Sequence, residues 1–595
     1  MIRRIRFNLL DTRLSLAGKR MAYFVLIGVI AGLGSIAFHY LCQIGSHGFM
    51  EWMAGYRPPA PAGESHLFHA IDVPFRRWML LFLPAIGGII SGWLVYTFAP
   101  EAEGHGTDAA IEAYHERGGF IRSRIPIIKT IASAVTLTSG GSGGREGPIA
   151  QIGAGFGSWV SRVLRLSTQE RRIFMLSGCA GGLGAIFRAP LGAAITSVEV
   201  LYREDFESEA IIPCVISSVI AFSMFTFVFG YDPIFATPGF VAHDLRELPI
   251  YAVLGLVCAP IGGLYVKVFY GTRDAFRRLT IPKHIRPMLG GLGVGLIALF
   301  IPQAIGGGYG YLQMAIYGQL SLLIMALAAT AKIATTSLTI GSGGSGGVFG
   351  PTLFIGGMIG GVVGQVGHML FPEVVTQPGA YVLVGMAAFF SGAAKAPLGA
   401  LIMVTEMTQS YALLPPLMLV SVIAILFNRG SSIYEKQVAN KFQSPAHEDD
   451  LTVNVMEELT VGQVFQPDKP FLTLPDHTRF AQLQTAVATS GQTVFPVTDH
   501  EGVFIGLLSL TNVRTVLFED SLRDLVVVGE LCTAPASLSV DESLYDALLK
   551  FLNTGYGQLP VVEVKQGRQH ILGMLDHDQV TAAYHQEVSR RMSPE

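Results

Sequence analysis

The sequence predicts an all-α polytopic membrane domain, built from two inverted repeats with broken helices, followed by a small C-terminal α/β pair. Three observations predict this fold: a strongly apolar composition, Gly-rich motifs that recur at one spacing, and an abrupt return of charged residues after about residue 440. Repeated, interrupted apolar segments are typical of transporters, because their binding sites lie between two such halves.

The composition favours a helical membrane protein. The chain has 595 residues, of which 50% are hydrophobic and 14% are charged, and its mean hydropathy is +0.46. The 69 glycines allow helix backbones to approach closely within a bilayer. A net charge of −3 excludes a typical nucleic-acid-binding protein. The five cysteines are scattered without metal spacing, so no metal site is predicted.

The first twenty residues are basic and lead directly into an apolar stretch. This stretch lacks a small-residue cleavage site, so it predicts a first membrane span and not a signal peptide. The basic flank predicts a cytoplasmic N-terminus.

Twelve apolar segments follow one another up to residue 427, and several are too short or too interrupted for a straight span of ~20 residues. Broken helices are tolerated at membrane depth where neighbours or a water-filled cavity satisfy the freed backbone groups, so the pattern predicts a transport pathway. The segments are 21–43, 78–98, 124–140, 149–165, 171–202, 211–230, 249–274, 286–302, 319–340, 351–371, 380–407 and 411–427.

The membrane domain, residues 1–445, repeats itself at a spacing of roughly 203 residues, with one copy at about 20–230 and the other at about 249–440. Three motifs recur in the same order. The matched positions are 104–106 with 308–310, 129–157 with 332–360, and 189–199 with 396–406. Gly/Pro-interrupted segments at matching positions predict a binding site where two inverted halves meet.

The motifs GGSGGREGP (140–148) and GGSGGVFGP (343–351) carry the predicted chemistry. Each places a proline where the first turn of a new helix begins, and proline is tolerated there. A helix that starts inside the membrane presents free N–H groups and a partial positive charge. If the halves are inverted, both helix starts converge on one place, which suits an anion.

Glu146 lies at this predicted meeting point. An ionisable residue in a membrane segment is a functional candidate by default, and a carboxylate here occupies the anion's own position. We therefore interpret Glu146 as a gate that blocks the path when charged. The alternative is a simple helix cap, but the matching residue in the other half is Phe349, and a cap would have an equivalent there.

Other polar residues in the repeats leave alternatives open. Lys129 and Lys332 either raise the electrostatic potential of the pathway or are paired or snorkelling lysines. His105 either donates to an anion or is solvated at the interface. Glu199 and Glu406 either serve the structure as buried, hydrogen-bonded groups or, for Glu199, contribute directly to transport.

Two further functions are weighed and not favoured. GGSGG fits the G-x-S-x-G pattern of serine hydrolases, but its flanks are apolar helix and no histidine recurs as a partner, so no enzyme is predicted. A cation transporter regulated by the C-terminal pair would need several membrane carboxylates or helix C-termini facing the site.

The tail, residues 446–595, repeats a small α/β unit at about 455–518 and 525–585. Pro496 matches Pro560, and Gly506 matches Gly573. Two stacked copies of one unit are predicted.

The GREGP of residues 144–148, the GVFGP of residues 347–351 and Tyr434 in NRGSSIYEKQ resemble the CLC family of chloride channels and proton-chloride antiporters, and the tail resembles a CBS-domain pair. The resemblance implies transport of chloride or a similar anion, a homodimer in the lipid bilayer, and a multi-pass protein of the cell (inner) membrane with both termini cytoplasmic. Glu146 is implied as the gating glutamate. The implied anion-binding residues are His105, Gly106, Gly144, Arg145, Gly147, Val348, Phe349, Gly350 and Tyr434.

Departures from the family pattern keep the coupling mechanism open. His105 stands where the family's GSGIP motif has its serine. Glu199 is followed by Val200, where the best-known antiporters have a second glutamate that relays protons, so both a channel and a proton antiporter remain open, with Glu199 as a candidate for the proton pathway. Fluoride is less favoured than chloride. In the tail, Asn512 and Gln579 replace the aspartate of nucleotide-binding CBS pairs, so no cofactor is predicted and adenosine-nucleotide binding is doubtful.

Overall fold

The computed structural model describes residues 16–64, 66–240, 244–447, 455–514, 526–565 and 567–592. The chain forms two compact units, Met1–Lys441 and Phe442–Glu595. The first is helical and the second combines short strands with helices, which confirms the predicted fold class.

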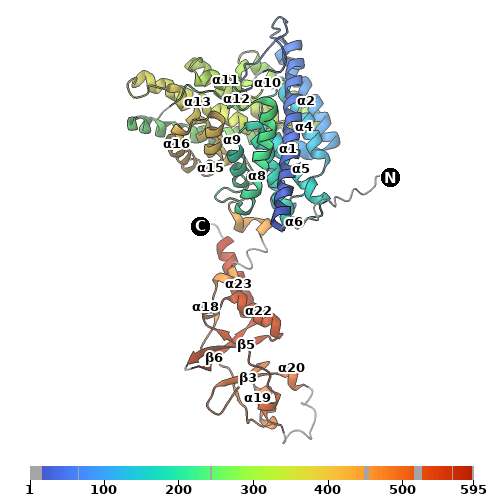
Figure 1. Cartoon of the computed structure of the whole chain (residues 1–595), viewed down its shortest axis with the longest axis vertical. Coiled ribbons are helices and arrows are strands. Elements are labelled where there is room, and N and C mark those ends of the chain that lie inside the picture. Colours follow the sequence, from blue (N-terminus) through green and yellow to red (C-terminus); the bar gives the residue numbers. More distant parts are fainter. Residues whose placement is uncertain are drawn as a thin grey trace, which may run out of the picture. The chain divides into compact units, whose positions relative to one another are not determined.

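The first unit is a bundle of helices, in which α1 and α8 lie side by side (Figure 1). Its first half contains α1 (Leu16–Ser46), α2 (Met79–Phe98), α3 (Thr107–His115), α4 (Arg124–Thr138), α5 (Glu146–Val163), α6 (Thr168–Phe187), α7 (Pro190–Glu199) and α8 (Ile211–Phe229). Its second half contains α9 (Leu248–Arg278), α10 (Arg286–Ala298), α11 (Tyr309–Ile316), α12 (Leu322–Gly341), α13 (Phe349–Leu370), α14 (Pro378–Ala394), α15 (Pro397–Thr408) and α16 (Leu414–Leu426).

Six helical stretches among the described residues are long and apolar enough to cross a membrane. Other helices, such as α7 with 10 residues and α15 with 12, are too short for a full span. This mixture of long and short helices is the broken-helix pattern that the sequence predicts. The six stretches are Met21–Met53, Met79–Phe98, Ser208–Phe229, Leu245–Arg278, Leu322–Gly341 and Phe349–Leu370.

Two apolar segments that we expected to be continuous are each split into two helices. The segment 171–202 breaks between α6 and α7 at Arg188, where φ is 51°, and the segment 380–407 breaks between α14 and α15 at Lys395, where φ is 59°. A proline follows two residues later in both cases, and proline disfavours helical geometry in the residue before it. The short helices α3 and α11 were not among the expected segments.

Reciprocal contacts relate the two halves of this unit. The Ser133 hydroxyl lies 2.8 Å from the Ser345 hydroxyl, and the Ser142 hydroxyl lies 3.0 Å from the Thr336 hydroxyl. Ser142 and Ser345 match in the repeat, as do Ser133 and Thr336, so each half makes the same contact with the other. Such exchange of equivalent partners is the signature of a two-fold relation between the halves.

Glycines allow one helix pair in each half to pack with almost no side chain between them. A Cβ atom added to Gly153 of α5 would lie 2.1 Å from the carbonyl oxygen of Gly178 in α6. A Cβ atom added to Gly356 of α13 would lie 2.2 Å from the carbonyl oxygen of Gly385 in α14. The same tight packing therefore supports α5 and α13, which carry the two repeated motifs at their starts.

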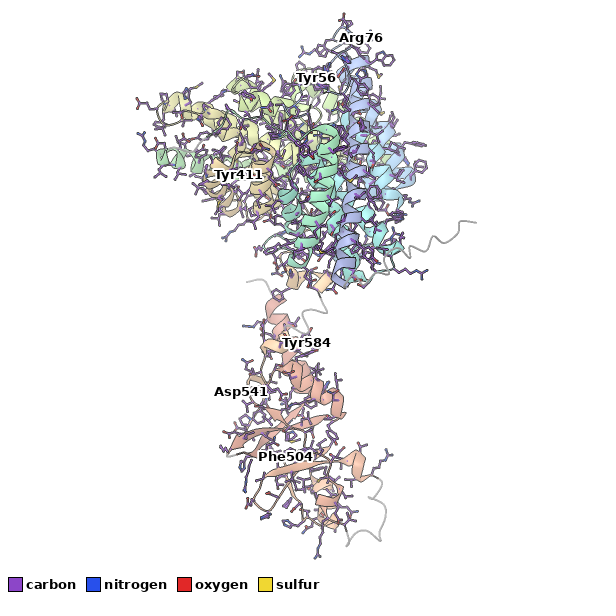
Figure 2. All side chains as sticks on the ribbon, in the orientation of Figure 1. Tyr56, Arg76, Tyr411, Phe504, Asp541 and Tyr584 are labelled. Carbon is purple, nitrogen blue, oxygen red and sulfur yellow. The ribbon has the colours of Figure 1, made fainter. Side chains whose placement is uncertain are left out.

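The second unit contains two three-stranded sheets of the same design. In each, a two-residue strand pairs in parallel with the middle strand, which pairs antiparallel with the third. Phe504, labelled in Figure 2, begins β3 and is buried in a core shared with residues of the second copy. The elements are α18 (Val461–Val464), β1 (Leu474–Pro475), α19 (Phe480–Thr489), β2 (Val494–Thr498), β3 (Phe504–Ser509), α20 (Leu510–Val513), α21 (Val528–Leu531), β4 (Leu538–Ser539), α22 (Leu544–Thr554), β5 (Gln558–Lys565), β6 (Arg568–Asp576) and α23 (His577–Met592).

Matched residues of the tail take matched positions in these sheets. Val497 pairs with Gly506 across one sheet, and Val561 pairs with Gly573 across the other. The Gln579 side chain accepts a hydrogen bond from the Asp576 N–H at 2.9 Å, so it helps to close the start of α23. The side chain of Asn512 lies outside the described residues.

Candidate functional site

The starts of α5 and α13 meet through the loops that precede them, which we call the paired loops (residues 139–145 and 342–348). Gly144 donates its N–H to the Gly347 carbonyl at 2.7 Å, and Gly347 donates to the Gly144 carbonyl at 2.8 Å. The two segments run antiparallel at this bridge. This geometry confirms the prediction that the two helix starts converge.

Glycine is required at the centre of this contact. A Cβ atom on Gly144 would lie 1.7 Å from a carboxylate oxygen of Glu146 and 2.8 Å from the backbone nitrogen of Gly350. A Cβ atom on Gly347 would lie 2.7 Å from the backbone nitrogen of Gly147. Any side chain here would separate the two helix starts and fill the space that the carboxylate takes.

Glu146 is the first residue of α5, and its side chain is 1% exposed. One carboxylate oxygen accepts a hydrogen bond from the Tyr309 hydroxyl. The other accepts from the Gly350 N–H, in the first turn of α13, at 3.2 Å. The carboxylate of one repeat is therefore held by the helix start and a side chain of the other.

The residues at the start of α13 are buried among apolar side chains. Val348 is fully buried, and the Phe349 ring packs against Phe187 and Phe390 with centroid distances of 4.9 and 4.2 Å. N–H groups in the first turn of a helix have no partner within that helix, so they are available to an external acceptor. In this apolar setting a hydrogen bond to a negative group is stronger than in water.

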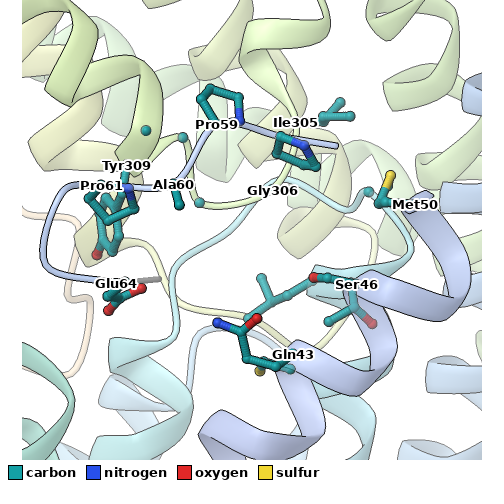
Figure 3. Close-up of a pocket in the computed structure, with 18 of the residues that line it drawn as sticks. Gln43, Ser46, Met50, Pro59, Ala60, Pro61, Glu64, Ile305, Gly306 and Tyr309 are labelled. Carbon is teal, nitrogen blue, oxygen red and sulfur yellow. The ribbon is translucent and has the colours of Figure 1, made fainter. Parts of the chain in front are cut away.

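Arg145 pairs its guanidinium with a carboxylate other than Glu146. It donates to the Glu64 carboxylate at 2.7 Å and contacts a ring nitrogen of His39 at 3.3 Å. These groups line a pocket of about 180 Å³, and Figure 3 shows Tyr309, Glu64 and Gln43 in its wall. The positive charge of Arg145 is thus matched by Glu64.

A second pocket, of about 370 Å³, is lined by His105 and Gly106. The Nε2 atom of His105 lies 3.1 Å from the Asp108 carboxylate, while its buried Nδ1 atom has no hydrogen-bond partner among the described residues. The carboxylate favours the proton on Nε2, which leaves Nδ1 as an acceptor in the neutral ring. His105 is therefore buried and oriented, which excludes the alternative of a solvated interfacial histidine.

Tyr434 is buried beside His105, with 5.6 Å between the ring centroids. The Asp108 carboxylate that contacts His105 also accepts from the backbone N–H groups of Glu435 and Lys436, at 3.3 and 3.2 Å. Asp108 thus ties the segment after Tyr434 to the start of α3. His105 and Tyr434 thus lie together near the start of α3, which Gly106 precedes.

The two repeated lysines are fully buried and do not snorkel. The Lys129 ammonium donates to the carbonyls of Ala102 and Gly104, at 3.0 and 2.8 Å. The Lys332 ammonium donates to the carbonyls of Ala304 and Gly306, at 3.3 and 2.6 Å. Each lysine ties down the loop that leads to His105 or Tyr309 in its own repeat.

Glu199 and Glu406 make reciprocal caps across the halves. The Glu199 carboxylate accepts from the N–H groups of Leu398 and Gly399 at the start of α15, at 3.0 and 2.7 Å. The Glu406 carboxylate accepts from Leu191 and Gly192 at the start of α7, at 3.3 and 2.8 Å. This contact gives both glutamates the structural role that the sequence left as one alternative.

Reasoning from the sequence missed Tyr309, Glu64 and Asp108. A signal for Tyr309 was present, because it occupies the position in the second repeat that His105 occupies in the first. Glu64 and Asp108 carry no repeat signal, since their importance depends on the tertiary contacts with Arg145 and His105.

Residues 87–429 match the family model described as voltage gated chloride channel, which is more than half of the chain. The chain belongs to this family. Residues 528–585 match the CBS domain model, at the position of the second copy in the tail.

Relatives of this chloride channel family member include a "putative chloride channel protein ClcB-like" of Ralstonia nicotianae, 30% identical over 421 residues, which are 70% of this chain and 95% of that protein. The "H(+)/Cl(-) exchange transporter ClcA" of Vibrio cholerae is 30% identical over 423 residues, which are 69% of this chain and 87% of that protein.

Solved structures share the fold. A slow cyanobacterial Cl−/H+ antiporter superposes with a TM-score of 0.63 at 22% identity, covering 71% of this chain and 97% of that one. A eukaryotic CLC transporter superposes with a TM-score of 0.55 at 18% identity, covering 94% of this chain and 97% of that one. The chain is thus a multi-pass membrane protein of the CLC type.

Proposed function

We propose that this chain exchanges chloride for protons across a membrane, and that Glu146 is the gate of the pathway. The observation that carries the proposal is the Glu146 carboxylate, held between the Tyr309 hydroxyl and the Gly350 N–H where the starts of α5 and α13 meet. Groups that bind a carboxylate oxygen also suit a halide, because both are anions that accept hydrogen bonds.

In the proposed mechanism the carboxylate and the anion compete for one place. The charged carboxylate occupies the helix starts and blocks the path. Protonation removes its charge and weakens its hold on the N–H groups, so that an anion takes its position. The amides of Val348, Phe349 and Gly350 bind the anion, and His105 and Tyr434 flank the path on the side of the larger pocket.

The arrangement suits passage because the positive field comes from helix ends and not from a nearby unpaired cation. Arg145 is paired with Glu64, and the lysines are tied to carbonyls. A site made of dipoles holds an anion firmly enough to select it and weakly enough to release it.

An uncoupled chloride channel is the second candidate. Val200, where the best-known antiporters have a proton-relaying glutamate, favours it. The named exchange transporters among the relatives favour coupling.

We also propose the setting of this activity. A homodimer with one pathway per subunit, in the cell (inner) membrane with both termini cytoplasmic, is what the family likeness and the basic first segment support.

Chloride flux from liposomes that contain the purified full chain tests the gate. Wild-type protein should release chloride faster as the pH falls, and Glu146→Gln should make the flux insensitive to pH, because an amide cannot titrate. Glu373→Gln is a matched control on an exposed surface loop and should behave as wild type. An unchanged pH dependence in Glu146→Gln would refute the gate.

Reversal potentials across a pH gradient test the coupling. With equal chloride on both sides, an exchanger develops a potential that follows the pH gradient, whereas a channel develops none. A zero potential would show that the protein is a channel and not an exchanger. The proposal of chloride transport would still stand.

A further inference from the structure

The contact between Tyr309 and Glu146 joins a side chain of one repeat to the gate of the other. Gly350 supplies a backbone N–H to one carboxylate oxygen, and Tyr309 supplies a side-chain hydroxyl to the other. The carboxylate oxygens mark where a permeating anion sits in the proposed mechanism. The donors that hold them are therefore candidates for its ligands.

Tyr309 is fixed independently of Glu146. It is the first residue of α11, and Gly308 before it takes a φ of 80°, which turns the chain into the helix. Its ring packs edge-on against Phe235 with 5.7 Å between centroids, and the Arg145 guanidinium lies 5.5 Å from its ring centroid. The ring is 7% exposed, so its hydroxyl stays in place when the carboxylate leaves.

We propose that the Tyr309 hydroxyl is a shared ligand: it holds the Glu146 carboxylate while the path is closed, and it binds the permeating anion once the carboxylate has left. This inference rests on the proposed function and adds a side-chain ligand to the backbone amides. A buried hydroxyl without a partner is costly, which favours an anion as the replacement acceptor. The same hydroxyl thereby couples departure of the gate to arrival of the anion.

The position of Tyr309 in the repeat agrees with this role. Its match in the first repeat, His105, lies beside Tyr434 at the larger pocket, whereas Tyr309 lines the smaller pocket. The two repeats thus place a polar ring at each of the two pockets. Only the ring of the second repeat touches the carboxylate among the contacts of the described residues.

Tyr309→Phe tests the proposal because it removes the hydroxyl and keeps the ring against Phe235 and Arg145. The matched control is Tyr311→Phe, in the same helix, whose hydroxyl lies 2.7 Å from that of Tyr56 and not at Glu146. Both changes are made in a Glu146→Ala background, where the carboxylate no longer competes with the anion. Chloride binding to the purified protein is then measured by calorimetry.

Tyr309→Phe should weaken chloride binding roughly tenfold, as expected for one lost hydrogen bond to a charged acceptor. Tyr311→Phe should leave the affinity within about twofold of the parent, which is less than one hydrogen bond contributes. Equal affinities of the Tyr309→Phe protein and its parent would overturn the proposal.

A second measurement uses Tyr309→Phe with Glu146 intact and records flux against pH. The lost hydrogen bond favoured the charged carboxylate, so protonation should release the gate more easily. The flux curve should move to higher pH by about one unit, which is the effect of one hydrogen bond of ordinary strength. A flux curve identical to that of wild type would also overturn the proposal that the Tyr309 hydroxyl is a shared ligand.

The proposed function and the ligand role of Tyr309 can be disproved separately. If Glu146→Ala protein neither binds nor conducts chloride, the proposed function is wrong. If it does both and Tyr309→Phe changes nothing, only the ligand role of Tyr309 is wrong.

Discussion

The loop before α5 and the loop before α13 use the same backbone contacts and carry different side chains. Each Gly of the Gly144–Gly347 bridge donates to the other, and each repeated lysine donates to two loop carbonyls of its own half. Yet α5 begins with Glu146 and α13 begins with Phe349, and the matched positions earlier in each half carry His105 and Tyr309. The halves are alike in what builds the site and unlike in what the site contains.

This difference distinguishes residues that maintain the structure of the site from residues that carry its function. Contacts that recur in both halves maintain the geometry of the helix starts, because each is needed on both sides of a two-fold relation. Side chains that differ between halves distinguish one side of the path from the other. Substituting both residues of a matched pair, and comparing the stability and flux of the two variants, therefore shows whether a residue maintains the structure or carries the function.

The largest difference is expected between Phe349→Ala and Glu146→Ala. Loss of the Phe349 ring from its contacts with Phe187 and Phe390 should lower stability by about 3–5 kcal/mol, because a buried cavity remains. Loss of the Glu146 carboxylate should lower stability by a smaller amount, about 1–3 kcal/mol, because the Tyr309 hydroxyl loses its acceptor, and should abolish the pH dependence of flux. Thermal unfolding in detergent and liposome flux measure the two effects, and equal destabilisation would contradict the division of roles.

Lys129→Met and Lys332→Met should destabilise the protein by equal amounts. Each change removes a buried ammonium from two carbonyls, at a cost of about 2–3 kcal/mol. Thermal unfolding midpoints of the two variants give the comparison. A loss confined to one lysine would show that the repeats do not share this support.

Glu199→Gln and Glu406→Gln should each cost about 1 kcal/mol, as expected for a weakened helix cap. The capping role predicts that neither changes the ratio of protons to chloride, which reversal potentials report. A ratio altered by Glu199→Gln and not by Glu406→Gln would assign Glu199 to the proton pathway.

The smallest effect is expected for His105→Ser. The ring lies at the larger pocket, its Nε2–H faces Asp108 and its Nδ1 is an acceptor, so the neutral ring offers chloride no donor. The change should keep the chloride affinity within about twofold, less than one hydrogen bond contributes, and leave the midpoint of the flux curve in place. Calorimetry and flux against pH check both parts. A shifted midpoint would place His105 in control of the gate.

The fold and the centre of the site could be predicted because the repeat is visible in the sequence. Spacing alone related Gly144 to Gly347 and Glu199 to Glu406, and the structure places each pair in direct or reciprocal contact. The breaks at Arg188 and Lys395 were missed although a proline follows each, because their apolar flanks suggested a single helix.

The partners of individual side chains could not be predicted. The resemblance of GREGP implied Arg145 as an anion-binding residue, and nothing in the sequence indicated that its guanidinium reaches Glu64. The contact of Tyr309 with Glu146 joins residues 163 positions apart. Which residue meets Glu146 depends on how the segments of the two halves fold against each other.

The central claim is that the starts of α5 and α13 form an anion site which the Glu146 carboxylate otherwise occupies. Anomalous diffraction from crystals of the Glu146→Ala protein grown in bromide tests it most directly. The account predicts a bromide peak at the Gly350 N–H and the Tyr309 hydroxyl, in the place of the lost carboxylate. Bromide found only in the two flanking pockets, with the Gly350 N–H unoccupied, would contradict it.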